Sequence, residues 1–122
     1  MPIEAVDLRA KFELFHEHWR PKIVAELNGQ EVKLVKLQGD FVWHSHADAD
    51  ELFLVWRGHL RLELRERTLE LEPGEMVVVP RGVEHRTSAD EETWALIFEP
   101  AATRNTGDVR DERLTAAGGE RI

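Results

Sequence analysis

Short segments of alternating apolar and polar residues, separated by turn-forming residues, follow one another along most of this chain. Asn28-Gly29, Arg57-Gly58 and Pro73-Gly74 are turn-forming pairs of this kind. Alternation with a period of two is typical of strands that bury one face. Roughly nine strands are expected, at residues 22–27, 30–37, 41–46, 51–56, 60–64, 68–71, 76–79, 83–87 and 93–98. Strands of this length and spacing favour an all-β fold, either a sandwich or a small antiparallel barrel.

The N-terminal residues follow a different period. Large apolar side chains recur there at spacings of four, three and four, which predicts one face of a short helix. These side chains are Leu8, Phe12, Phe15 and Trp19. The apolar face is expected to pack on the sheet or on a partner subunit.

A length of 122 residues fits one domain. We expect an N-terminal helical segment at residues 1–21, a barrel at residues 22–99 and a partly flexible C-terminal tail at residues 100–122. The tail contains few large apolar side chains, so a frayed end is favoured. A lid or an arm across a neighbouring subunit is the alternative.

The charge and hydropathy of the chain limit its partners. A net charge of −8 argues against nucleic acid, because phosphates repel such a surface. The chain contains no apolar run near the ~20 residues that a membrane-spanning helix needs. The N-terminus lacks the basic and apolar regions of a secretory signal. We therefore expect no nucleic-acid partner, no membrane partner and a cytoplasmic location.

The chain has no cysteine. Disulfides, thiolate ligands and cysteine nucleophiles are therefore excluded. Any bound metal must be held by nitrogen and oxygen atoms, a donor set that suits divalent Fe, Mn, Ni, Cu or Zn.

Such donors gather in one part of the sequence. His44 and His46 are two residues apart, so on a strand at residues 41–46 their side chains point to the same face. Glu51 opens the next strand, and His85 follows a sharp Pro80-x-Gly82 turn. Three imidazoles and a carboxylate brought to one end of a sheet can share a cation, which satisfies all four buried polar groups. This pattern predicts a non-haem site for a divalent transition metal.

These residues give the sequence a resemblance to the cupin superfamily. The first motif of that family is matched by Gly39-x4-His44-x-His46-x4-Glu51-x6-Gly58, and the second by Gly74-x5-Pro80-x-Gly82-x2-His85. The match covers roughly residues 30–99. Two positions depart from the family pattern: the first spacer is one residue shorter than usual, and Ala89 stands where an asparagine often closes the second motif.

The resemblance implies an antiparallel jelly-roll β-barrel with the metal inside. His44, His46, Glu51 and His85 match the metal ligands of the family, residue by residue. By strand alternation, Val42 is expected beside the two histidines. Phe53 and Val55 are expected beside Glu51, where they line an apolar pocket.

Charged residues near the motifs have two possible roles. Asp48 and Asp50 can orient an imidazole or lie in a solvated loop, and the loop is the commoner outcome. Arg57, Arg81 and Arg86 can bind an anionic substrate at the pocket mouth, although pairing with nearby acids is favoured for each.

Two functions follow from this site. The first is a small-molecule metalloenzyme, of the oxygenase or the isomerase type, in which Glu51 acts as ligand, catalytic base or both. Short cupins similar to this one are often described as sugar-phosphate isomerase-like, but a fold and a motif do not define a substrate. The second is a non-catalytic module that binds a metal or a small ligand. A vestigial, purely structural site ranks lowest, because no ligand is missing.

Two predicted strands, at residues 52–56 and 94–98, are apolar on both faces. A two-layer domain buries only one face of each strand, so the second face needs a cover. The N-terminal helix or a second subunit can provide it, and we expect a homodimer.

Overall fold

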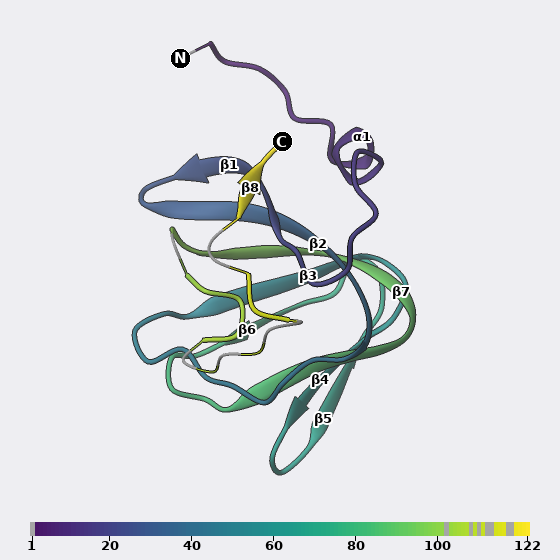
Figure 1. The fold of residues 1–122 in the computed structure, drawn as a ribbon, viewed down its shortest axis with the longest axis vertical. Coiled ribbons are helices and arrows are strands. Elements are labelled where there is room, and N and C mark those ends of the chain that lie inside the picture. Colours follow the sequence, from purple (N-terminus) through teal and green to yellow (C-terminus); the bar gives the residue numbers. More distant parts are fainter. Residues whose placement is uncertain (1, 102, 108, 110, 112–113, 117–118) are drawn as a thin grey trace.

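The structure, a computed structural model, describes residues 2–101, 103–107, 109, 111, 114–116 and 119–122 (Figure 1). The elements are, in chain order, α1 (Leu8–Phe12), β1 (Lys22–Leu27), β2 (Gln30–Asp40), β3 (Glu51–Arg57), β4 (Leu60–Leu64), β5 (Thr68–Leu71), β6 (Met76–Val79), β7 (His85–Pro100) and β8 (Glu120–Arg121). The all-β jelly-roll class with one short helix is confirmed.

The long strand β7 joins the two layers of the jelly roll. One of its edges pairs with β2, and the other pairs first with β4 and then with β3. The strand order is β5-β4-β7-β2-β1-β8, with β6 on the free edge of β3. Figure 1 shows β4 and β5 diverging from the layer that contains β1 and β2. Strand pairing among the described residues does not run in a complete ring, so this barrel is open.

The long strands β2 and β7 each continue through a bend where the sequence predicted a break between two strands. Gly39 falls between the predicted strands at residues 30–37 and 41–46, yet it lies inside β2, at a register shift where its φ is +87°. Residues 83–87 and 93–98, predicted as two strands, belong largely to β7. The pairs Gly39–Ala89 and Asp40–Ser88 continue the ladder past the shift. A bulge bends a strand without ending it, which explains the difference.

The core between the layers is built by alternate residues of each strand. Val35 and Leu37 of β2 point inward together with Phe53 and Val55 of β3, as period-two alternation requires. The same cluster contains Leu60, Leu62, Leu71, Val79, Ala89, Ala95 and Ile97. This apolar interior supplies most of the free energy that holds the layers together.

The N-terminal segment covers the outer face of the sheet. Asp7 caps α1 by accepting a hydrogen bond from the backbone N–H of Ala10 (3.1 Å). The Phe12 ring stacks on Trp94 at 5.0 Å between centroids. The helix ends at Phe12, so it is shorter than the predicted apolar stripe. Trp19 has a φ of +64° and its ring stacks on Phe41 instead.

The described residues of the C-terminal segment pack on the barrel, unlike the frayed tail that the sequence favoured. β8 pairs in parallel with β1, and the Leu114 side chain is buried. The Asn105 amide donates to the backbone oxygens of Trp19 (3.2 Å) and Leu114 (2.8 Å). Parts of this range lie outside the described residues, so its predicted partial flexibility stays a prediction. The described helix is too short to cross a membrane.

Candidate metal centre

The His44-x-His46 segment differs from the strand predicted at residues 41–46. β2 ends at Asp40, and in the segment that follows only His44 forms a bridge, with His85 at the start of β7. The His44 N–H donates to the His85 carbonyl (3.0 Å), and the His85 N–H donates to the His44 carbonyl (2.9 Å). This pair of backbone hydrogen bonds joins the two cupin-like motifs directly.

The structure brings the four predicted ligands together. One ligand atom each from His44, His46, Glu51 and His85 lies within 4.8 Å of the others, and all four residues are buried. Glu51 begins β3 and His85 begins β7, so both project from strand starts at the same end of the barrel.

Backbone carbonyls orient two of the imidazoles. Nδ1 of His44 lies 2.9 Å from the Val42 carbonyl oxygen, and Nδ1 of His85 lies 2.9 Å from that of Val83. Because a carbonyl only accepts, Nδ1 carries the proton in both rings, and in the neutral form of each ring Nε2 holds the lone pair. Each Nε2 is therefore available as a ligand atom, and the carbonyls do the orienting work for which Asp48 and Asp50 were candidates.

The donor set fits a divalent metal ion. Nε2 of His46 is buried without a hydrogen-bond partner, 3.4 Å from a Glu51 carboxylate oxygen. The same oxygen lies 3.3 Å from Nε2 of His85. A buried imidazole nitrogen without a partner is costly. A cation placed among these nitrogen and oxygen atoms removes that cost, and this donor set suits Fe, Mn, Ni, Cu or Zn.

The electrostatics of the centre favour a neutral His44 imidazole beside an ionised Glu51 carboxylate. Burial, followed by repulsion from His85, lowers the pKa of His44 to about 4. Burial alone would raise the pKa of Glu51, but the imidazoles of His46 and His85 outweigh it and lower that pKa well below its usual range. A neutral imidazole and an ionised carboxylate are the states that metal ligation requires of His44 and Glu51.

A small pocket opens beside His44 and Glu51. Its volume is about 30 Å³, which is enough for about two water molecules. Its lining consists of Trp19, Pro21, Val35, Leu37, Phe41, His44, Glu51, Phe53, Thr87, Ile97, Glu99 and Asn105. Phe53 is among them as predicted, whereas Val42 and Val55 are not.

The pocket contains a charged residue that the sequence reasoning missed. Glu99 of β7 is buried, and one of its oxygens lies 3.0 Å from the ammonium of Lys33, which is buried on β2. Burial, followed by the neighbouring Glu51 carboxylate, raises the pKa of Glu99. The sequence contained a signal. Lys33 lies two residues before Val35, and Glu99 lies two residues after Ile97, so each shares the inward face of its strand.

The charged residues near the motifs face partners on the surface. Arg81 pairs with Asp50 (3.3 Å) and Arg86 with Glu63 (3.1 Å). The guanidinium of Arg57 lies over the Trp94 ring at 4.4 Å. The pairing that the sequence favoured for Arg81 and Arg86 is present.

Comparison with known proteins supports this picture. The family model described as "Cupin domain" matches residues 27–98, which is more than half of the chain. A Bacillus subtilis (strain 168) protein described as "Uncharacterized protein YdbB" is 34% identical over 77 residues, covering 62% of this chain and 68% of the relative.

Two solved structures share the fold. A cupin-2 domain containing protein from Shewanella frigidimarina is 47% identical with a TM-score of 0.77, covering 78% of this chain and 93% of that one. Protein NMB1881 from Neisseria meningitidis is 28% identical with a TM-score of 0.74, covering 80% and 100%. The descriptions of these three relatives mention no substrate. The family match, the fold and the clustered motif residues together show that this chain belongs to the cupin superfamily.

Proposed function

We propose that the protein is a small-molecule metalloenzyme in which His44, His46, Glu51 and His85 hold one divalent transition-metal ion. The cluster of four buried ligand atoms within 4.8 Å of one another carries this proposal, because a bound cation also satisfies Nε2 of His46, which has no hydrogen-bond partner. Two further imidazoles are held by backbone carbonyls with Nε2 available.

The reaction belongs to the oxygenase or the isomerase type, with the substrate unassigned. A bound ion supplies a Lewis acid or a site for O2. The protein itself supplies an apolar wall of Phe41, Phe53 and Ile97 that excludes water from the reacting end. The lowered pKa of Glu51 suits a ligand role, and the additional catalytic role predicted for this residue needs a test of activity.

A non-catalytic module that binds a metal or a small ligand is the second candidate. The small volume of the pocket favours it, since about 30 Å³ leaves little room for a substrate unless the covering residues move. Trp19 and Asn105 line the pocket from outside the barrel strands, so they are the covering residues whose movement would enlarge it.

Turnover separates the two functions. The protein is loaded with Fe(II), Mn(II) or Ni(II) and mixed with small hydroxy acids and trioses, while an oxygen electrode and proton NMR follow O2 uptake and isomerisation. The proposal expects turnover that is lost in His46→Ala. Saturable binding without O2 uptake or a new product in any mixture supports the module instead.

We also propose that the protein is a homodimer. Trp56, Met76 and Val78 are exposed on β3 and β6, and the outer edge of β6 pairs with no described strand. An exposed apolar edge strand favours association. Light scattering should give twice the chain mass for the wild type and the chain mass for Val78→Lys; a monomeric wild type contradicts the dimer.

The cytoplasmic location stays a prediction from the sequence.

A further inference from the structure

The pocket has a polar wall as well as the metal ligands. Glu99 is 2% exposed, and its second carboxylate oxygen, Oε2, has no hydrogen-bond partner. Its first oxygen is held by Lys33, whose ammonium also donates to the Thr103 carbonyl oxygen (3.3 Å). The pair is therefore fixed from behind, and the free oxygen belongs to a side chain that lines the pocket.

Resting on the function proposed above, we propose that Glu99, held by Lys33, binds a hydroxyl group of a neutral, hydroxylated small molecule whose other end reaches the metal ligands. The chemistry of a hydroxyl group carries this choice. A hydroxyl both donates and accepts hydrogen bonds, so it satisfies Glu99 Oε2 in either protonation state of the carboxyl group.

The charge around Glu99 argues against an anionic group at that end of the ligand. Among the described residues that line it, none is lysine or arginine, and the nearby Lys33 is already paired with Glu99 and with Glu31 (3.6 Å). A phosphate or carboxylate placed beside Glu99 would be desolvated next to an acidic side chain without a cation of its own.

The volume leads to the same class of ligand. Room for about two water molecules accepts a terminal hydroxyl or hydroxymethyl group beside Glu99, whereas a phosphate group with three oxygens needs more; the rest of the ligand enters only if the covering residues move. The apolar rings of Phe41 and Phe53 suit the carbon atoms between the two polar ends.

The test uses dihydroxyacetone and its phosphate ester, which differ only in charge and size at one end. The wild-type protein is loaded with Co(II), whose visible absorption reports the coordination sphere, and each probe is titrated by absorption and by calorimetry. We expect dihydroxyacetone to bind and the phosphate ester to bind at least about tenfold more weakly. This comparison requires no variant.

Two variants test the role of Glu99. Lys33→Met/Glu99→Leu removes the polar wall without leaving a buried charge unpaired. It should retain Co(II) and bind dihydroxyacetone at least about tenfold more weakly, the loss expected for one hydrogen bond to a charged group. Glu99→Gln keeps the shape and a hydrogen-bonding group, so its affinity should stay within a few-fold of the wild type. A purely structural role for Glu99 would leave the affinity unchanged in both variants.

Each failure has a distinct meaning. A wild type that binds no Co(II) contradicts the proposed function. Retained Co(II) with equal dihydroxyacetone affinity in the double variant overturns only the role of Glu99. Tighter binding of the phosphate ester, or no response to dihydroxyacetone, overturns the neutral ligand class while the metal site stands.

Discussion

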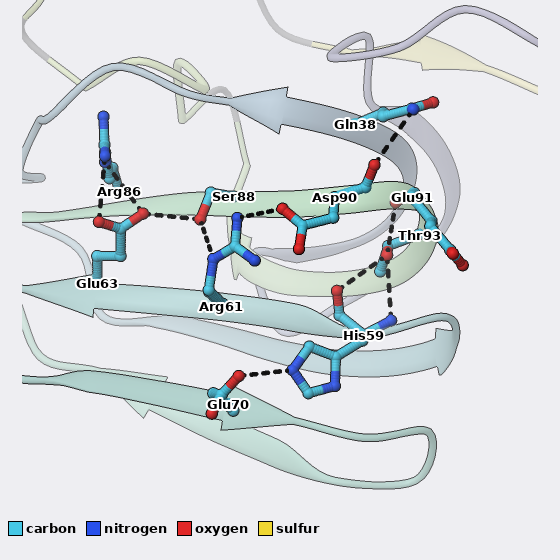
Figure 2. A network of polar contacts seen from close by, with 10 residues as sticks. All are labelled: Gln38, His59, Arg61, Glu63, Glu70, Arg86, Ser88, Asp90, Glu91 and Thr93. Carbon is cyan, nitrogen blue, oxygen red and sulfur yellow. Dashed lines mark hydrogen bonds and ion pairs between the residues drawn. The ribbon is translucent and has the colours of Figure 1, made fainter.

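The polar side chains on the two faces of β7 have different kinds of partner. On the outer face, Ser88 donates to Glu63 (2.7 Å) and accepts from Arg61 (3.0 Å), while Arg86 pairs with Glu63 from the adjacent position (Figure 2). On the inner face, His85 lies in a cluster where a neighbouring imidazole nitrogen has no partner. Arg86 Nε and His46 Nε2 are both buried without a hydrogen-bond partner, but the outer network pairs each cation with an acid, whereas the inner cluster gathers three imidazoles around one carboxylate.

This difference separates structure from function within four consecutive residues. Cross-strand pairs on a sheet surface stabilise a fold by small amounts each. Three buried imidazoles around one carboxylate cost stability, so the composition of the inner cluster is explained by what it binds. Changes on the inner face should therefore affect metal binding, and changes on the outer face should affect only stability.

The largest effect is expected when adjacent residues on the two faces are each replaced by alanine. His85→Ala removes a ligand and should weaken Co(II) binding more than about a hundredfold, since even the loss of a group that only orients a ligand costs up to that much. Arg86→Ala, one residue further along, should retain the wild-type affinity. Competition titration with a chelator measures both. Equal affinities in the two variants would remove the distinction between the faces.

The next effect is a pH dependence of opposite sign for two histidines. The pKa of buried His44 is lowered from 6.5 to about 4, so the unfolded state takes up a proton first on acidification. Metal-free protein should lose about 3 kcal/mol of unfolding free energy between pH 6.5 and pH 4 through this group. Urea unfolding across that range, with His44→Leu as the control that lacks the slope, measures it.

The exposed His59 provides the matched contrast. Its ring nitrogens lie 3.0 Å from Glu70 and 2.8 Å from Glu72, and these carboxylates raise its pKa. Its stabilisation is full below the unfolded pKa and is lost as the pH rises through the folded value. His59→Gln should therefore destabilise the protein slightly at acid pH and not at alkaline pH. If unfolding free energy changed with pH in the same direction through both histidines, the buried environment assigned to His44 or the acidic one assigned to His59 would be wrong.

A smaller effect tests the covering of the inner face by the C-terminal segment. Gly107 has a φ of +61°, and a Cβ there would clash with the carbonyl oxygen of Ser45, which lies between the two histidines of the first motif. Gly107→Ala should cost about 2 kcal/mol through backbone strain and displacement of the segment. Gly29→Ala, at similar φ with nothing within 4 Å, is the control for strain alone. Equal losses of unfolding free energy would show that the close approach to Ser45 has no effect.

The smallest effect concerns the outer network. Ser88→Ala removes the hydroxyl that links Glu63 and Arg61, and we expect a loss of about 1 kcal/mol, typical of one hydrogen bond. Thermal unfolding measures this change. Metal affinity should not change, and a large drop would mean that the two faces are coupled through the strand.

The positions of the candidate ligands were predictable because their residue types and spacings are local in two motifs. The detailed geometry was less predictable. The bend in β2 depends on pairing with β7, which is distant in sequence, so the sequence predicted a break between strands at Gly39. Trp19 left the helical stripe because Phe41, a residue of the barrel, offers it an aromatic partner.

Glu99 and Lys33 show a different limit. Their alternation with inward-facing residues was visible, but charged residues are rarely placed in a core without a known partner. Only the antiparallel register of β2 and β7 reveals that the two side chains meet.

The most direct test of the metal site is anomalous diffraction from crystals soaked with Zn(II), recorded at the zinc absorption edge. We predict one strong peak at about 2.0–2.1 Å from Nε2 of His44, His46 and His85, with Glu51 completing the ligands. The exposed cluster of His59, Glu70 and Glu72 should give none. A peak at that outer cluster with none among the buried histidines would contradict the account.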